Sequence, residues 1–205
     1  LPVLAAHSPS DCFDVAIEAA RIALTYMTPV ILLSDLYVAN GAEPWQVPNV
    51  SDLAKIENSY ANEDEEYIIY KRNKETLARS QAIPGQVGLE HRIGGLEKGE
   101  DGGVSYDPEN HEEMSHLRAQ KIAGISKSFG PTDISGEEKG DLLVIGWGGT
   151  YGAISSAVKN LRDEGFSISS IHLRHLNPLP DDLGAIIGNF KKVIVPELNL
   201  GQLNL

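Results

Sequence analysis

The apolar residues follow three different patterns along the chain, and the first pattern covers residues 1–48. Within it, an apolar run at 2–6 precedes a stretch at 12–27 whose apolar side chains recur at helical spacing. Pro29 ends that helix, and the uninterrupted apolar run at 30–33 predicts a parallel strand that is buried on both faces. Strand, helix and strand make one βαβ unit, whose sheet edge and helix face both need neighbours. This zone is therefore predicted to be the tail of a larger doubly wound domain, and the chain, which does not open on Met, to be an internal piece.

The third zone, residues 141–205, has the clearest alternation of strands and helices. Its pattern predicts strands at 141–146, 168–173 and 193–197, a helix at 151–164 and a second helix from Pro180 or Asp181 to Phe190. Short loops between alternating strands and helices are typical of a parallel sheet with right-handed crossovers.

The middle zone, residues 49–140, is polar and rich in glycine, and it holds the acidic run 63–66. Such a pattern predicts a long connection with a few short elements, among them a polar helix at 111–125, wrapped on the domains rather than folded alone. The acidic run is interpreted as a solvated face.

Composition excludes several classes of function. The formal net charge of −12 and the pI of about 4.9 argue against a nucleic-acid partner. No apolar run is long enough to span a membrane, and a cytoplasmic, reducing location fits the single cysteine, Cys12. One cysteine excludes a disulfide framework or an iron–sulfur site within this chain. We interpret Cys12 as a core residue rather than a reactive thiol.

A glycine-rich turn, Gly146–Gly152, follows a strand and opens a helix, which is the setting in which backbone N–H groups can bind a phosphate. A NAD site also needs an acidic residue at the end of the next strand. That strand ends in Ile171–His175, which contains no acidic residue. A tight turn without a nucleotide is therefore the better interpretation. His111 and His116 stand five positions apart rather than four, so no metal site is predicted, and the histidines are interpreted as hydrogen-bonding or surface groups.

Candidate binding residues follow the strand predicted at 30–33. Asp35, Tyr37 and Asn40 lie in the loop directly after it, and ligand sites of open α/β sheets gather at the carboxyl ends of strands. The alternative is ordinary turn chemistry with an interface contact.

Several segments, in order along nearly the whole chain, resemble the alpha subunits of 2-oxoacid:ferredoxin (acceptor) oxidoreductases, most closely the 2-oxoglutarate enzyme. The residues that carry the resemblance are His7–Asp14, Tyr26–Asp35, Ala42–Trp45, Ser105–His111, Arg174–Pro180 and Pro196–Leu203. The first three are similar to the end of the family's pyrimidine-binding domain, the fourth to its connecting segment, and the last two to its second domain, which is like the C-terminal domain of transketolases.

The resemblance implies an α/β fold in three parts. Residues 1–48 are the C-terminal part of a thiamine-diphosphate-binding pyrimidine domain, 49–140 a linker with short elements, and 141–205 the start of a three-layer, transketolase C-terminal-like parallel-sheet domain. It also implies a function: as part of an alpha subunit, the chain helps to oxidise and decarboxylate a 2-oxoacid with coenzyme A to acyl-CoA and CO2, reducing ferredoxin.

Thiamine diphosphate and Mg²⁺ are, by the same resemblance, shared with and mainly held by the beta subunit, and the iron–sulfur cluster lies in the partner subunit only. The activating glutamate and the substrate-binding residues precede Leu1, so this chain alone is expected to be inactive. Asp35, Tyr37 and Asn40 remain as candidates for the rim of the cofactor site or the alpha–beta contact. The alternatives are a stand-alone nucleotide-binding, Rossmann-like module and a non-catalytic assembly scaffold.

Overall fold

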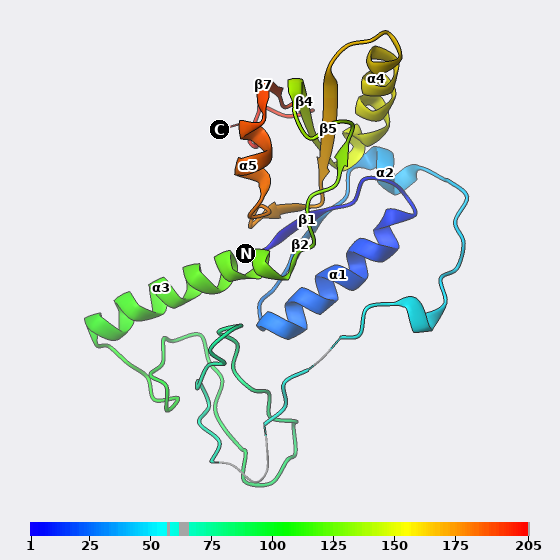
Figure 1. Cartoon of the computed structure of the whole chain (residues 1–205). Coiled ribbons are helices and arrows are strands. Elements are labelled where there is room, and N and C mark those ends of the chain that lie inside the picture. Colours follow the sequence, from blue (N-terminus) through cyan, green and yellow to red (C-terminus); the bar gives the residue numbers. More distant parts are fainter. Residues whose placement is uncertain (57, 62–65, 205) are drawn as a thin grey trace.

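The structure is a computed structural model that describes residues 1–56, 58–61 and 66–204 of the chain (Figure 1). Its elements are, in chain order, β1 (Val3–Ala5), α1 (Asp11–Tyr26), β2 (Ile31–Leu33), α2 (Leu36–Asn40), the 3-10 helix η1 (Val50–Asp52), α3 (Pro108–Gly124), η2 (Ile125–Ser128), β3 (Ile134–Ser135), β4 (Gly140–Trp147), η3 (Gly148–Thr150), α4 (Tyr151–Asp163), β5 (Ile168–Leu173), β6 (His175–Asn177), α5 (Leu183–Gly188) and β7 (Phe190–Ile194).

The first sheet has the strand order β2-β1-β6, in which β1 is parallel to β2 and antiparallel to β6. Helix α1 lies along this sheet (Figure 1) and packs Val15 and Ile22 against Leu4 of β1. Val38 of α2 and Ile125 of η2 complete the same buried cluster. The βαβ unit predicted from the apolar pattern is therefore confirmed, and its core also includes a segment from the far end of the middle zone.

Local sequence explains the bounds of α1. The hydroxyl of Ser8 accepts a hydrogen bond from the Asp11 N–H at 3.3 Å, and Asp11 and Asp14 place negative charge in the first turn. Met27 ends the helix in a left-handed conformation with φ of 45°. The helix predicted at 12–27 is thus confirmed to within one residue at each end.

The expectation that residues 30–33 are buried on both faces is wrong. Ile31, Leu32 and Leu33 are 42%, 37% and 36% exposed. Among the described strands, β2 is an edge strand that pairs only with β1. A continuous apolar strand is half-exposed here because a parallel sheet buries both faces only when elements cover each of them.

The second sheet has the order β3-β5-β4-β7, with β5, β4 and β7 parallel and β3 antiparallel at one edge. α4 covers one face and α5 the other (Figure 1). On the α5 side Leu143, Ile171 and Ile186 are buried together, and on the α4 side Val144 and Val158. The predicted three-layer α/β domain is confirmed, with the added antiparallel strand β3.

The last two elements differ from their predicted bounds. α5 is shorter than the helix predicted to reach Phe190, and β7 starts at Phe190 rather than at Val193. Phe190 pairs with Gly140 of β4 and packs into the buried cluster under α5. Burial of the phenyl ring in this cluster stabilises Phe190 at the start of the strand rather than at the end of the helix.

The sequence pattern also missed β6, the strand that joins the two parts of the fold. β6 is three residues long and pairs with β1, and the Asn177 side-chain amide donates to the Leu1 carbonyl at 2.7 Å. A strand of three residues is too short for its periodicity to be recognised. The domain bounds at 48 and 140 stay a prediction.

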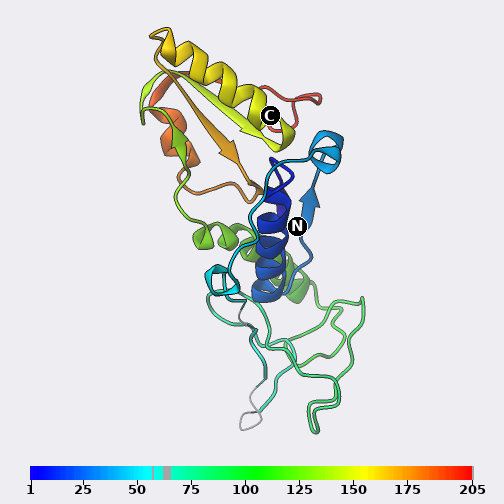
Figure 2. The same cartoon turned by 90° about the vertical axis from the view of Figure 1, so that its right-hand side faces the viewer.

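The part of the middle zone that precedes α3 forms a lobe that extends away from both sheets (Figure 2), rather than wrapping on the domains as predicted. The described residues of 53–107, here called the loop lobe, contain only isolated β-bridges, such as that between Arg72 and Arg79. Residues 63–65 of the acidic run lie outside the described residues, and Glu66 is exposed. Among the described helices, none combines the length and apolarity that a membrane crossing requires.

Burial under α5 predicts a clear difference between two leucine-to-alanine substitutions. Leu143 is fully buried, whereas Leu198 is 86% exposed. Leu143→Ala is expected to lower the free energy of unfolding by about 2–5 kcal/mol because it removes buried methyl groups and leaves a cavity. Leu198→Ala is expected to stay within about 0.5 kcal/mol of the wild type. Urea unfolding followed by circular dichroism measures both, and equal effects would contradict the assignment of the core.

Candidate functional site

Asp35 joins the two halves of the fold. It caps the N-terminus of α2, where its Oδ1 accepts the Val38 N–H at 2.8 Å. Its Oδ2 accepts the Gly149 N–H at 3.0 Å, across 114 residues of sequence. Both carboxylate oxygens therefore serve backbone N–H groups. The loop predicted at 34–40 is in fact a short helix for most of its length, because this cap satisfies its first turn.

Tyr37 and Asn40 lie on the same short helix. The Tyr37 side chain is 81% exposed, and that of Asn40 donates to the Leu36 carbonyl at 2.9 Å. Leu36 itself is 80% exposed, so α2 presents an apolar and aromatic surface next to the exposed strand β2. The structure thus keeps the three predicted site residues together, with the Asp35 carboxylate engaged by backbone N–H groups and Tyr37 turned to solvent.

The glycine turn binds an anion, but the anion is the Asp35 carboxylate. A Cβ at Gly149 would collide with Oδ2 of Asp35, so only glycine permits this contact. Gly148 has a φ of 58°, in the left-handed region that favours glycine. Since Asp35 occupies the N–H that a phosphate would use, the turn does not favour a nucleotide in the described fold.

A buried carboxylate lies at the centre of the junction between the two halves. Asp11 is 5% exposed, forms an ion pair with Arg174, and accepts the His7 N–H at 3.1 Å. The His7 Nδ1 lies 2.8 Å from the same carboxylate. Burial by itself raises the pKa of Asp11, but the hydrogen bonds from His7 and the positive charge of Arg174 outweigh it and lower that pKa. Asp11 is therefore an anion in the folded protein at neutral pH.

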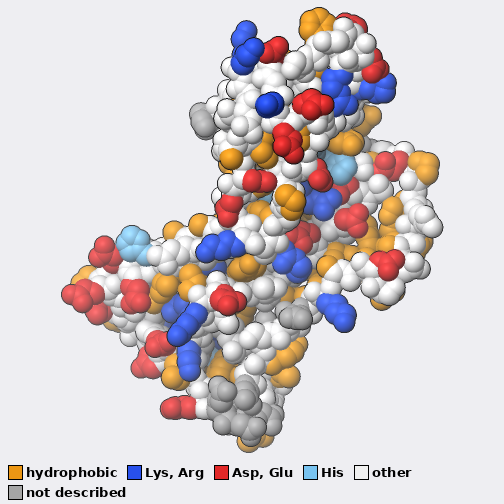
Figure 3. Space-filling view, viewed as in Figure 1, with side chains coloured by type: hydrophobic (Ala, Val, Ile, Leu, Met, Phe, Trp, Pro, Cys, Tyr) orange, Lys and Arg blue, Asp and Glu red, His pale blue; other side chains and the backbone are white. Residues whose placement is uncertain are grey.

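Three rings meet beside this carboxylate. The ring centroids of His7 and Tyr151 are 4.5 Å apart, and those of Tyr151 and His172 are 5.1 Å apart. A histidine is visible on this face of the molecule between the two sheets (Figure 3). The His172 Nε2 lies 3.1 Å from the Gly148 carbonyl, which can only accept, so Nε2 carries the hydrogen.

The other ring nitrogen of His172, Nδ1, is buried without a hydrogen-bond partner among the described residues. It faces the backbone of Gly146, where an added Cβ would lie 3.0 Å from it. Burial, then the nearby His7, lower the pKa of His172 to about 4. His172 is therefore a neutral imidazole at physiological pH, which agrees with its interpretation as a hydrogen-bonding group.

Glu18 of α1 links this helix to β6. Glu18 accepts two hydrogen bonds from Arg21, both at 2.7 Å, and lies 3.3 Å from the His175 Nε2. Burial raises the pKa of Glu18, but the hydrogen bonds from Arg21 and His175 outweigh it and lower the pKa to about 2. The His175 ring stacks on Phe129 at 3.7 Å. The contact between Glu18 and His175 was not predicted from the sequence. The run Arg174–His175 after a strand is the only signal of it that the sequence offers.

A cleft of about 640 Å³ opens beside the junction. Its lining combines both halves of the fold and includes His7, Phe129, Tyr151, His172, Arg174 and His175. In the part of the chain that the structure describes, no group of three or more His, Cys, Asp or Glu side chains could hold a metal ion. Cys12 is partly buried against the first core and donates to the Ser8 carbonyl at 3.5 Å, as expected for a structural thiol.

Comparison with known proteins identifies the family. Residues 1–104 match the family model described as pyruvate flavodoxin/ferredoxin oxidoreductase, thiamine diP-binding, which is about half of the chain. The chain belongs to this family. It contains the end of a thiamine-binding α/β domain followed by a parallel-sheet domain.

Particular relatives narrow this assignment. The chain is 50% identical over 203 residues to the 2-oxoglutarate oxidoreductase subunit KorA of Mycobacterium tuberculosis, covering 98% of this chain and 31% of the relative. It is 30% identical over 204 residues to the 2-oxoglutarate synthase subunit KorA of Archaeoglobus fulgidus, covering 98% of this chain and 50% of that protein. These matches confirm the resemblance to alpha subunits of 2-oxoacid:ferredoxin oxidoreductases, most like those of the 2-oxoglutarate enzymes.

A solved structure shares the fold. The chain superposes with a TM-score of 0.90 and 31% identity on 2-oxoglutarate:ferredoxin oxidoreductase from Magnetococcus marinus, whose structure has 2-oxoglutarate, coenzyme A and succinyl-CoA bound. That match covers 99% of this chain and 36% of the other. The chain therefore spans between about a third and about half of the length of the proteins it matches.

The contact between Asp35 and Gly149 predicts opposite effects of two glycine-to-alanine substitutions. Gly149→Ala is expected to lower the melting temperature, because the methyl group displaces the Asp35 carboxylate and breaks the α2 cap. Gly152, inside α4, has no neighbour within 4 Å of an added Cβ. Gly152→Ala is expected to raise the free energy of unfolding by up to about 1 kcal/mol through helix propensity. Thermal unfolding measures both, and a loss of stability in both variants would count against the contact.

The depressed pKa of His172 predicts a loss of stability in mild acid. Its folded pKa of about 4 lies below its ordinary value of 6.5, so the unfolded chain takes up a proton first as the pH falls. The contribution of neutral His172 to the free energy of unfolding is complete above pH 6.5. It is lost as the pH drops towards 4, by at most about 3 kcal/mol. In His172→Gln this part of the pH dependence is expected to vanish. The measurement is the free energy of unfolding in urea of wild type and His172→Gln from pH 7 to pH 4. If the difference between the two proteins stays the same over this range, the prediction is refuted.

Proposed function

We propose that the chain forms part of the alpha subunit of a thiamine-diphosphate-dependent 2-oxoglutarate:ferredoxin oxidoreductase. The overall reaction converts 2-oxoglutarate, coenzyme A and two oxidised ferredoxins into succinyl-CoA, CO2, a proton and two reduced ferredoxins. The observation that carries this proposal is the match through both halves of the fold, at 50% identity over 98% of the chain in one relative and a TM-score of 0.90 in another. The substrates named in that solved structure agree with it.

The residues of this chain fit one side of a cofactor site. Thiamine diphosphate, when bound, supplies the electron sink for decarboxylation. The described residues offer no acidic cluster for the Mg²⁺ that would accompany the diphosphate. On the strength of the family resemblance, we assign the diphosphate, the Mg²⁺ and the iron–sulfur cluster to the beta subunit, and a position on the pyrimidine side to this chain.

The exposed surface of β2 and α2 is the part of the chain proposed to face the partner subunit. Leu36 and Tyr37 are about four-fifths exposed, and Ile31 to Leu33 more than a third. Contiguous apolar exposure of this kind marks a surface that another polypeptide covers. Tyr37 and Asn40 are proposed at the rim of the cofactor site, with Asp35 as the positioning residue that orients α2. The same proposal includes the domain bounds at 48 and 140, ferredoxin as the acceptor and a cytoplasmic location.

The test uses the full-length alpha subunit assembled with its beta subunit. We expect reduction of ferredoxin or viologen only when both 2-oxoglutarate and coenzyme A are present. Tyr37→Ser is expected to weaken thiamine diphosphate or beta-subunit binding several-fold, because Tyr37 would lose its aromatic contact area at the interface. Tyr106, which is 88% exposed in the loop lobe, provides the matched control Tyr106→Ser.

Two outcomes would decide against the proposal. Inactivity of the assembled enzyme towards every 2-oxoacid would remove the function. Equal effects of Tyr37→Ser and Tyr106→Ser would remove the assignment of α2 but leave the function standing. Calorimetric binding of NAD or ATP would instead favour the alternative, a nucleotide-binding module, against which the occupied Gly149 N–H already argues.

A further inference from the structure

Three cations converge where the loop lobe meets α3. Arg72 and Arg79 face each other across an antiparallel bridge of the lobe, and Lys121 lies on α3. All three are half-buried. Basic side chains gather just below α3 on the face shown in Figure 3. The arrangement holds three positive charges together in a chain whose 29 acidic residues outnumber its 17 basic ones.

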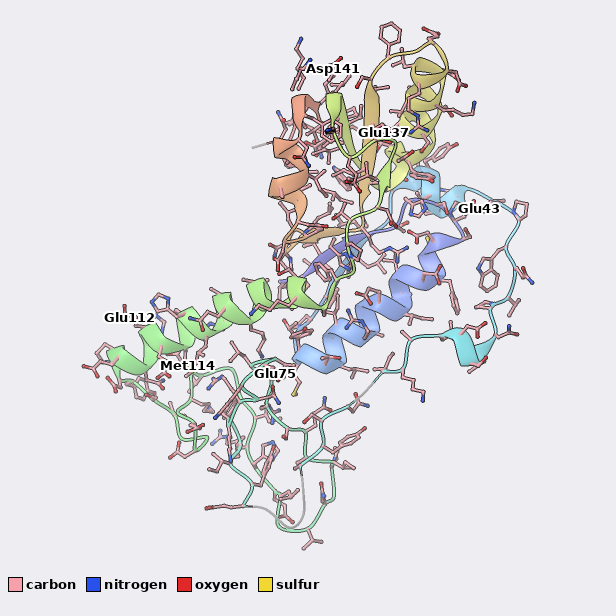
Figure 4. All side chains as sticks on the ribbon, viewed as in Figure 1. Glu43, Glu75, Glu112, Met114, Glu137 and Asp141 are labelled. Carbon is pink, nitrogen blue, oxygen red and sulfur yellow. The ribbon has the colours of Figure 1, made fainter. Side chains whose placement is uncertain are left out.

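Among the described residues, the Arg72 guanidinium has weak acceptors. One nitrogen donates to the Tyr70 carbonyl at 3.4 Å, and the other lies 2.9 Å from the Met114 sulfur. Figure 4 places Met114 on the face of α3 towards the lobe and Glu112 on the other side. A thioether is a weak acceptor, so it does not neutralise a guanidinium.

The described contacts of Arg79 are with aromatic and polar side chains rather than with carboxylates. Its Nη1 lies 3.4 Å from the Tyr67 hydroxyl and 3.4 Å from the His91 Nε2. Its guanidinium lies over the Tyr70 ring at 5.6 Å. These contacts orient the planar group without supplying a negative charge.

Lys121 lies seven residues, or about two helical turns, beyond Met114 on α3, and so on the same side of the helix as the Arg72 contact. Burial, then the charges of Arg72 and Arg79, lower the pKa of Lys121. Within the described part of the chain, none of the three cations has a carboxylate at ion-pair distance, whereas Arg21, Arg118, Lys159 and Lys191 each have one. A half-buried group of like charges is unfavourable unless an anion joins it.

We propose that Arg72, Arg79 and Lys121 form a binding site for a phosphate dianion, either inorganic phosphate or the phosphomonoester group of a small ligand. One carboxylate would leave two of the three charges uncompensated, whereas a dianion balances two of them. The forked donors of two guanidinium groups also match the oxygens of a phosphate. The site is separate from the β2–α2 surface and goes beyond the proposed function.

The experiment follows thermal unfolding of the full-length subunit assembled with its partner, with chloride replaced by phosphate at constant ionic strength. We expect phosphate to raise the melting temperature, because a ligand that binds only the folded state stabilises it. Lys121→Met is expected to melt higher than the wild type in chloride, since it removes a repelled charge, and to bind phosphate about tenfold or more weakly. Adenosine 5′-monophosphate in a parallel titration distinguishes a phosphomonoester from free phosphate as the preferred ligand.

Two further variants make the result specific. Arg79→Gln keeps a hydrogen-bonding side chain and is also expected to lose phosphate binding. Lys127→Met removes an exposed lysine just beyond α3 and is expected to respond to phosphate like the wild type. An unchanged phosphate response in Lys121→Met and Arg79→Gln would overturn the site. A second result would also overturn the site: neither ligand changes the melting temperature of the wild type, and Lys121→Met weakens subunit association. A carboxylate of the partner subunit would then be the counterion.

Discussion

The buried Asp11 carboxylate is the interaction on which the arrangement of the two halves depends. It comes from the first turn of α1 and binds Arg174, 163 residues later, at the end of β5. An ion pair of this kind stabilises less than its geometry suggests, because both ions lose water, but losing one partner costs about 3–5 kcal/mol. The effect of this ion pair is to fix the end of β5 relative to the first turn of α1. With Arg174 held at α1, β6 follows directly and pairs with β1, so the chain passes straight from β5 of the second sheet into the first sheet.

A second bridge fixes the other end of the junction. Asp35 holds α2 with one oxygen and the η3 turn with the other, and the turn in turn accepts His172 through the Gly148 carbonyl. The glycines are therefore needed for close approach of a neighbouring carboxylate rather than for a nucleotide. The same geometry leaves Tyr37 and Leu36 on the outside, where an apolar surface gathers beside β2. The junction thus combines fixed internal contacts with an exposed apolar surface beside it.

The three zones of the chain contribute differently to the packed cores and to the exposed surfaces. The two sheets carry the buried clusters and the junction, whereas the described residues of the loop lobe form only isolated bridges, with Arg72 and Arg79 facing α3 without a described carboxylate at ion-pair distance. Segments with few apolar contacts are the ones that ligands and partners order. Both proposed binding surfaces therefore lie outside the packed cores: the β2–α2 face at one end and the cations Arg72, Arg79 and Lys121 at the other.

The sequence by itself determined the elements whose apolar period is long enough to recognise, namely α1, α4 and the strands around Leu143 and Ile171. It also supported the family, because ordered segments along the whole chain carry the resemblance, and it placed Asp35, Tyr37 and Asn40 in one loop. Only the tertiary structure decided what those residues touch. Neither β6 nor the pairing of Asp11 with Arg174 has a local signal, since each depends on residues more than 150 positions apart. For the same reason Ile31–Leu33 read as a buried strand but lie at an exposed edge: burial is a property of neighbours, and local pattern does not say whether they are present.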